Sequence, residues 1–350
     1  MGAALDFRAM EHAEDDLIAF RECFERNGTP RRLDALRWQY LKNPTGELFV
    51  DLAVSDQRIG AIYAVQPAVV RVRGARMLAA QSVDTLVDAD FRRRGLFIKM
   101  AEAVYQRVRE RDGAFVYGFP NENSAPGFFD KLGWLSLDPV PFLMRPLRIG
   151  FVGSKLPLAR WPRWLPDLRL PIIGPRLQAD QEFRPVTELG SELGALWERF
   201  ASGVMVAVDR SPQYLRWRLG KPGERYQCLG VFEAARLVAF CAYTTVDKHG
   251  GRIGYVIELL HDPGHQATGA ALLVECLRRM ASEGADAVLA WAFRHSPNAR
   301  AYSKAGFLPF PERFRPVELH IGVRPLDDSL TEALSDRRNW YISYCDSDTV

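Results

Sequence analysis

The sequence predicts a mixed α/β protein built from two tandem copies of one domain, each a twisted mixed sheet flanked by helices. The first observation is the stretch Val83–Trp134, where a strand-like run leads into an Arg-rich turn, a helical run, a second strand-like run and a polar turn. The second is that a similar order of elements recurs later in the chain. The third is length, because 350 residues exceed what one hydrophobic core usually serves.

The elements of the first half follow from local patterns. Apolar residues at helical spacing predict a helix over residues 11–25, which Asn27-Gly28 should end. Residues 36–44 (LRWQYLKNP) favour a short helix and a turn. Alternating or continuous apolar runs then predict strands, with a long helix between the last two. The expected strands are 48–54, 59–65, 69–72, 79–87 and 114–119, and the expected helix is 96–111.

The second half repeats this plan. An LRW motif occurs at Leu36–Trp38 and again at Leu215–Trp217, and we interpret both as packing units. Strands are expected at 228–232, 237–244 and 252–260, followed by a helix over 270–283. Matching anchors in the same order indicate an ancient duplication. The predicted boundaries are 1–145 for the first domain, 146–180 for a linker, and 181–350 for a second domain with a C-terminal strand over 340–344.

The segment between the two copies is rich in proline and basic residues. Residues 145–179 hold six prolines and seven basic residues against one acid, Asp167. One interpretation is a proline-stiffened linker. The other is a basic and aromatic face, with Trp161 and Trp164, that contacts a membrane surface or an anionic lipid-linked substrate.

Composition excludes several classes of protein. A net charge of +3 does not by itself indicate nucleic-acid binding, so we expect no nucleic-acid partner. The five cysteines form no CxxC, which argues against a zinc site and fits a reducing compartment; the histidines also lack metal-ligand spacing, so no metal is expected. Neither a signal peptide nor a long apolar run is visible, and we predict a cytoplasmic protein. The sequence does not set the oligomeric state.

The Arg-rich turn is the most informative feature. Arg92, Arg93, Arg94 and Gly95 stand where a helix begins. The first backbone N–H groups of a helix have no partner within it, and the helix dipole is positive there. Three arginines add charge-assisted donors. The turn therefore predicts a site for a phosphate or pyrophosphate group.

In this stretch the chain resembles the GNAT superfamily of acyl-CoA-dependent N-acyltransferases. Their signature, Q/R-x-x-G-x-G/A, holds the CoA pyrophosphate; Arg92 and Gly95 match it, while Phe97 replaces the last small residue. A downstream N-x-x-A…K-x-G-aromatic segment is matched by Asn123, Ala125, Lys131, Gly133 and Trp134. The resemblance implies acetyl-CoA as the default donor. It also implies a set of cofactor-binding residues: Leu86, Val87, Arg92, Arg93, Arg94, Gly95, Leu96, Phe97 and Asn123.

The second copy carries the signature letter for letter, as Gln266-x-x-Gly269-x-Ala271. It has no basic residues at the turn, and His261, Asp262 and His265 flank it. We therefore expect the first copy to bind CoA and the second to act as a scaffold.

Acyl transfer to an amine requires removal of a proton and departure of a thiolate. Asp84 and Glu258 hold equivalent places on the strands that lead to the two turns, near where the superfamily places general bases; either is alternatively a structural carboxylate. The tyrosine that often protonates the leaving thiolate is replaced by Phe129 in the first copy. Either solvent protonates the thiolate, or another group such as Tyr117 does so.

The acceptor is predicted to be a small polar amine. Asn121, Asn123 and Ser124 lie on the polar turn and either bind pantetheine or the acceptor, or cap the next helix. Asp346 and Asp348 in the tail are further candidates for acceptor binding. The resemblance points to an amino sugar or nucleotide-linked amino sugar in bacterial polysaccharide assembly. Three alternatives stay open: a protein or peptide acetyltransferase, an aminoacyl-tRNA-dependent peptidyl transferase, and a non-catalytic CoA-binding module.

Overall fold

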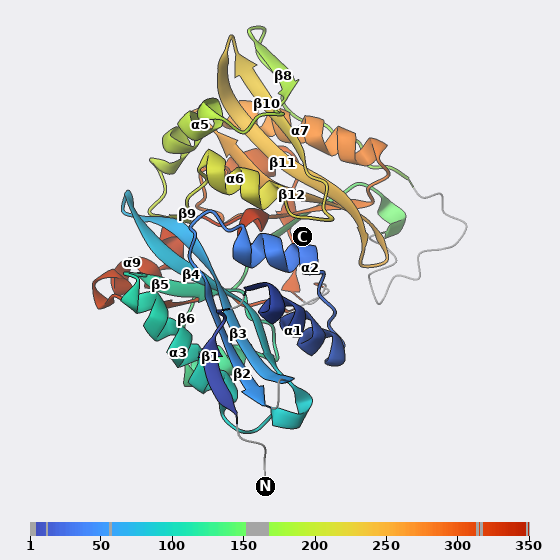
Figure 1. The fold of residues 1–350 in the computed structure, drawn as a ribbon. Helices are drawn as coiled ribbons and strands as arrows, with labels where there is room; N and C mark the ends of the chain where they lie inside the picture. The colour runs from blue at the N-terminus through green and yellow to red at the C-terminus, as the bar shows by residue number, and fades with distance from the viewer. Residues whose placement is uncertain are drawn as a thin grey trace. The chain divides into compact units, whose positions relative to one another are not determined.

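The computed structural model describes residues 5–11, 13–55, 58–151, 168–312, 315, 318–347 and 349. The chain forms two compact units (Figure 1). Unit 1 comprises Met1–Pro139, Gly220–Gly223 and Leu319–Arg337. Unit 2 comprises Val140–Leu219, Glu224–Glu318 and Arg338–Val350.

The sheet of unit 1 has the strand order β1-β2-β3-β4-β5-β15-β6. Its neighbours pair antiparallel except β4 and β5, which are parallel. The parallel register runs from Ala80↔Val116 to Ser82↔Gly118. The strands are β1 (Asp6–Ala9), β2 (Phe49–Ser55), β3 (Arg58–Val72), β4 (Ala75–Val87), β5 (Phe115–Gly118), β6 (Leu135–Ser136) and β15 (Gly322–Pro325).

Helices cover both faces of this sheet. One apolar cluster joins α3 to residues such as Ala61 and Tyr63 of β3, and a second joins α1 to Ile62 and Ala64 of the same strand. Because successive strand residues point to opposite faces, α1 and α3 lie on opposite sides (Figure 1). The helical segments are α1 (Ala13–Arg26), α2 (Leu33–Leu36), η1 (Arg37–Leu41), η2 (Ala89–Phe91), α3 (Leu96–Glu110), η3 (Gly127–Lys131), η5 (Asp328–Leu330), α9 (Thr331–Ser335) and, at the boundary with unit 2, η6 (Arg337–Asn339).

Unit 2 repeats this architecture. Its sheet order is β14-β7-β13-β12-β11-β10-β8, again with one parallel pair, β12 with β13. A buried cluster joins α7 to the sheet. The elements are β7 (Phe142–Pro146), β8 (Gln181–Pro185), α5 (Ser191–Ala201), β9 (Val206–Val208), α6 (Pro212–Leu219), β10 (Gln227–Glu233), β11 (Arg236–Lys248), β12 (Gly251–His261), α7 (Gln266–Ser282), β13 (Ala287–Trp291), α8 (Ala299–Lys304), β14 (Leu308–Pro309) and η7 (Tyr344–Asp346).

Each sheet contains one strand that comes from the other half of the chain. β7 follows the first half of the chain but lies beside β13 in the sheet of unit 2, and β15 follows the second half but lies beside β5 in unit 1. Each unit is therefore discontinuous in sequence, whereas the sequence analysis drew contiguous boundaries. Strand pairing is non-local, so no local pattern marks which sheet a short strand joins.

The C-terminal segment differs from the strand expected over 340–344. Trp340 forms a single bridge with Val206, and Tyr344–Asp346 forms a 3₁₀ turn. Ser343 and Asp346 make a capping box, in which each side chain accepts from the backbone of the other. This local capping competes with extension and turns the chain inward.

Candidate active site

Unit 1 contains an open cleft of about 680 Å³ at the point where β4 and β5 end their parallel register. Open α/β sheets commonly bind ligands where neighbouring strands diverge at their carboxyl ends. The sequence-predicted residues that line this cleft are Asp84, Leu86, Val87, Arg92, Arg93, Arg94, Gly95, Leu96, Phe97, Asn121, Asn123 and Ser124.

The turn before α3 leaves the start of the helix open. Arg93 and Gly95 both have positive φ, 64° and 72°, which folds the chain so that α3 begins at Leu96. No side chain caps this N-terminus, and a Cβ at Gly95 would meet no atom within 4 Å. The first turn of α3 thus belongs to the cleft wall, and its backbone N–H groups have no side-chain cap. Gly95 suits this position because the left-handed region costs other residues roughly 1 kcal/mol or more.

The arginines of the turn are exposed. Arg92 donates from Nε to the Val87 carbonyl at 3.3 Å, and Arg94 lies 5.1 Å from the centroid of the Phe91 ring. Among the described residues, no carboxylate forms an ion pair with either arginine or with Arg93. Their charge is therefore available to an anion at the positive end of α3.

Phe97 stands where the superfamily signature has a small residue, and the structure accommodates it locally. Its ring packs against Tyr63 and Phe128 at centroid distances of 5.7 and 5.2 Å. A Cβ at Gly127 would lie only 2.7 Å from the Phe97 ring, so Gly127 makes the space that Phe97 fills. The larger side chain forms part of the cleft floor.

Asp84 lines the cleft but is 3% exposed. Its Oδ1 accepts from Arg31 Nη2 at 3.0 Å, and its Oδ2 accepts from Tyr40 at 2.8 Å and Gln39 at 3.1 Å. These donors come from the α1–α2 loop and η1. Asp84 is therefore both a cleft residue and the anchor of a polar cluster.

The polar turn is tightly organised by Asn121. The Asn121 Oδ1 accepts from the backbone N–H groups of Asn123 and Ser124, both at 3.1 Å, and from the Ser124 hydroxyl at 3.2 Å. This Asx turn corresponds to the capping role that the sequence left open. All three side chains still belong to the cleft wall.

Two residues relevant to thiolate release lie elsewhere. Tyr117, the suggested proton donor, is 4% exposed, packs 6.0 Å from the Phe115 ring, and is not among the cleft residues. Phe129, in the place of the usual tyrosine, lies with its ring centroid 6.0 Å from that of His320. His320 in turn contacts Asp138, with Nδ1 and Oδ2 2.6 Å apart.

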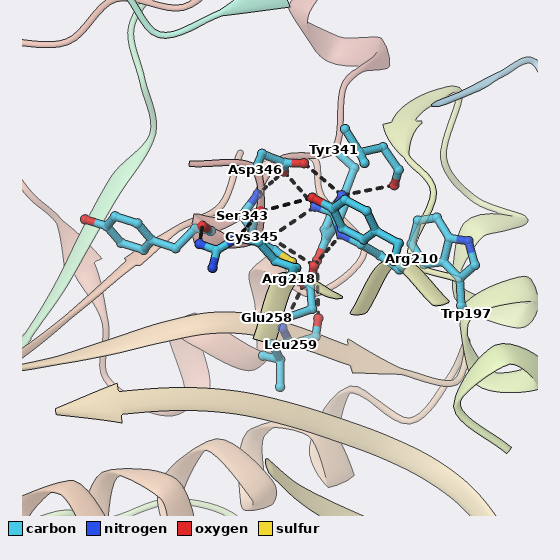
Figure 2. A network of polar contacts seen from close by, with 12 residues as sticks. Trp197, Arg210, Arg218, Glu258, Leu259, Tyr341, Ser343, Cys345 and Asp346 are labelled. Carbon is cyan, nitrogen blue, oxygen red and sulfur yellow. Dashed lines mark hydrogen bonds and ion pairs between the residues drawn. The ribbon is translucent and has the colours of Figure 1, made fainter. Parts of the chain in front are cut away.

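Glu258 and Asp346 lie in a buried network of unit 2 (Figure 2). Arg210, which is 0% exposed, donates to Glu258 at 2.7 Å and to both oxygens of Asp346 at 2.8 and 2.6 Å. Glu258 also accepts from Tyr341 and Ser343. Two carboxylates beside one guanidinium hold the pKa of Arg210 well above its usual range. The structure therefore gives both acids a structural setting within unit 2.

The second signature turn is closed by its own surroundings. A Cβ at Gly269 would lie 2.6 Å from the His261 ring, so the turn packs against this imidazole. Asp262, which is 2% exposed, pairs with Arg199 at 2.5 Å and with Arg236. The ring packed near the start of α7 opposes phosphate binding, and Asp262 engages both nearby arginines, in contrast to the open arginines of unit 1.

Several cleft residues were not predicted. Phe24, Thr29 and Arg31 line the side formed by the end of α1 and the loop after it. This loop carries no motif, and only the fold brings it to β4. Trp161, Trp164 and Asp348, together with residues 152–167 of the basic linker, lie outside the described residues. In the part of the chain that the structure describes, no cluster of acids, histidines and cysteines could hold a metal ion, and no helix is long and apolar enough to cross a membrane.

Comparison with known proteins bears on the family and the fold. Residues 9–136 match the family model of the acetyltransferase (GNAT) domain. The fold resembles that of N-myristoyltransferase from Saccharomyces cerevisiae with bound myristoyl-CoA, at 12% identity and a TM-score of 0.60, over 92% of this chain and 83% of that one. No curated protein matches the sequence.

Two further solved structures share the fold. A GCN5-related N-acetyltransferase from Anabaena variabilis matches at 12% identity and a TM-score of 0.63, over 94% of this chain and 74% of that one. A tandem GNAT protein of the clavulanic acid biosynthesis pathway matches at 12% identity and a TM-score of 0.57, over 92% and 98% of the two chains.

The family match of residues 9–136 indicates an acyl-CoA-dependent acyltransferase. Residues 9–136 belong to the acetyltransferase (GNAT) domain family, and the two units together share the fold of tandem GNAT proteins. The predicted fold class and the predicted family are both confirmed.

Proposed function

We propose that unit 1 transfers an acetyl group from acetyl-CoA to the amine of a small polar acceptor, an amino sugar or nucleotide-linked amino sugar of bacterial polysaccharide biosynthesis. One observation carries the donor half of this proposal. The predicted cofactor residues line a single cleft, at whose entrance exposed arginines flank an uncapped helix N-terminus. A CoA pyrophosphate matches this charge and these donors.

The floor of the cleft supports a short acyl group. Trp134 lines the cleft and donates from Nε1 to the Tyr105 hydroxyl at 3.1 Å, and Tyr105 lies 2.6 Å from the Tyr63 hydroxyl. All three rings are buried, and that of Trp134 belongs to the cleft wall. A Cβ at Gly118 would already lie 3.4 Å from Trp134. An acetyl group fits such a floor, whereas a long chain would require the rings to move.

The chemistry needs few side chains. The acceptor nitrogen forms a bond to the thioester carbonyl carbon, the carbon–sulfur bond breaks, and CoA leaves as a thiolate. Backbone groups of β4 beyond Ser82 no longer pair with β5 and are suited to orient the carbonyl. Because Tyr117 is not a cleft residue and the cleft is open, we propose that the thiolate takes its proton from solvent.

Asp84 is the candidate base. Among the described residues that line the cleft, it is the one with an acidic side chain. Arg31, Tyr40 and Gln39 already donate to its carboxylate. We therefore propose that the amine proton reaches Asp84 through a water molecule. One of these donors then gives up its hydrogen bond to the carboxylate oxygen that is protonated.

A thiol-release assay tests the proposed function. Acetyl-CoA and myristoyl-CoA are each offered with glucosamine, a uridine-diphosphate-linked amino sugar, a basic peptide, and no acceptor. We expect CoA to appear with acetyl-CoA and an amino sugar. Turnover of the peptide alone, or of myristoyl-CoA in preference to acetyl-CoA, would contradict the proposal, as would failure on every amine combined with binding to tRNA.

A further inference from the structure

The cleft wall contains a cation, Arg31, that was not predicted from the sequence. Within the described residues, the cleft wall contains one acid, Asp84, against five basic side chains: Arg31, Arg92, Arg93, Arg94 and Lys131. The arginines of the turn belong to the donor site proposed above. Arg31 is different, because it comes from the loop between α1 and α2.

Arg31 is held in a fixed orientation. Its Nε and Nη2 both donate to Asp84 Oδ1, at 3.3 and 3.0 Å, and its guanidinium carbon lies 4.8 Å from the centroid of the Phe24 ring. The Asp84 side chain is 3% exposed, whereas that of Arg31 is 40% exposed. The ion pair therefore buries its negative end and presents its positive end to the cleft.

The loop that carries Arg31 is anchored at both ends of its first turn. Asn27 donates from Nδ2 to the Cys23 carbonyl at 2.9 Å and accepts from the backbone N–H of Ala89 at 3.2 Å. The Thr29 N–H donates to the Phe24 carbonyl at 3.0 Å. These bonds tie the residues just before Arg31 to α1 and to the segment after β4.

Arg31 is also separate from the proposed pyrophosphate site. Its partner Asp84 lies three residues before Val87, the last residue of β4, which corresponds to roughly 10 Å along a strand. The donor phosphates would lie beyond that end, at the turn. Arg31 thus stands beside the stretch of β4 where the thioester and the attacking amine would meet.

We infer that the acceptor carries an anionic group, a carboxylate or a phosphate, in addition to its reacting amine, and that Arg31 binds this group. The inference rests on the proposed function and narrows its acceptor. An arginine held by a buried carboxylate and an aromatic ring loses little freedom when it binds an anion. Asp84 is a positioning residue for Arg31 as well as the candidate base. A basic peptide would meet like charge here, so the peptide acceptor is disfavoured.

Binding measurements test this inference without requiring turnover. Three sugars that share one amine are titrated calorimetrically into the full chain: glucosamine, glucosamine 6-phosphate and 2-amino-2-deoxyglucuronic acid. Saturating CoA is present throughout, so that the turn arginines are occupied. We expect at least one anionic sugar to bind roughly tenfold or more tightly than glucosamine, because a charge-assisted hydrogen bond is lost in the neutral sugar. The stronger of the two anionic sugars identifies phosphate or carboxylate as the group.

The variant Arg31→Gln keeps a donor near Asp84 but removes the charge. We expect it to abolish the preference for the anionic sugar while CoA affinity stays within about twofold, since Arg31 lies away from the turn. Arg109→Ala, a basic residue of α3 outside this cleft, is the matched control and should keep the preference. Equal affinity for all three sugars, or a preference that survives in Arg31→Gln, would overturn the inference. Neither result decides the proposed function, which the thiol-release assay measures separately.

Discussion

Replacing Arg92 and Arg94 together by alanine should remove most of the electrostatic binding of acetyl-CoA. Both side chains are exposed and flank the N-terminus of α3, but each is supported, by the Val87 carbonyl and the Phe91 ring respectively. A hydrogen bond to a charged group contributes roughly 1.5 kcal/mol at the low end of its range, and exposure to salt lowers this. Two such losses amount to about 2–3 kcal/mol, or roughly a 30-fold to 150-fold weaker affinity.

Isothermal titration with acetyl-CoA at two ionic strengths measures this effect. The wild-type affinity should fall with added salt, and the double variant should show a smaller dependence. Arg236→Ala is the matched control, because Arg236 is an exposed arginine that pairs with Asp262 beside the second turn. The thermal unfolding midpoint of the double variant should be nearly unchanged. An affinity within twofold of wild type in the double variant, or a large loss in Arg236→Ala, would refute the placement of the donor in unit 1.

Three further predictions follow from single contacts. Gly127→Ala should destabilise unit 1 by about 1–3 kcal/mol, because the new Cβ would press on the Phe97 ring. Adding Phe97→Leu should recover most of this loss of stability in denaturant titrations. If the two substitutions instead lower the free energy of unfolding additively, the contact is contradicted. Asp84→Asn should lower kcat roughly 100-fold with little change in the KM for acetyl-CoA, whereas an unchanged kcat would exclude it as the base. Burial lowers the pKa of His261 below its ordinary value of 6.5, so the unfolded chain takes up this proton first and the free energy of unfolding of unit 2 should decrease as the pH falls below about 6.5. His261→Gln should flatten that dependence between pH 7 and 5.5, and an equal slope in both proteins would argue against it.

The sequence was most informative where function depends on neighbouring residues. The Arg92–Gly95 turn, the start of α3 and the polar turn at Asn121 are local features, in which glycine, arginine and Asx chemistry act within a few residues. The duplication could be detected from the sequence for a related reason, because equivalent short motifs recur in the same order in both halves. These signals sufficed for the fold class and for the residues that now line one cleft.

Tertiary packing decided the rest. Asp84 and Glu258 look equivalent in sequence, yet one lines a cleft and the other is enclosed with Arg210 and Asp346. Both carboxylates are buried, and nothing local distinguishes the one at a cleft wall from the one in a closed network, because the setting depends on residues distant in the chain. Arg31 was missed for the same reason.

Phe97 shows how local packing accommodates a residue that departs from a family motif. The sequence shows a large side chain where the superfamily has a small one, and only the structure shows that Gly127 lies opposite it. Close packing makes such pairs interdependent, so the departure is matched by a neighbour 30 residues later in the chain.

A crystal structure with acetyl-CoA bound tests the central claim most directly. We expect the pyrophosphate at the backbone N–H groups of Gly95, Leu96 and Phe97, within reach of Arg92 and Arg94, and the thioester between β4 and β5 near Asp84. Density for acetyl-CoA at Gly269 instead, with the cleft of unit 1 empty, would contradict it.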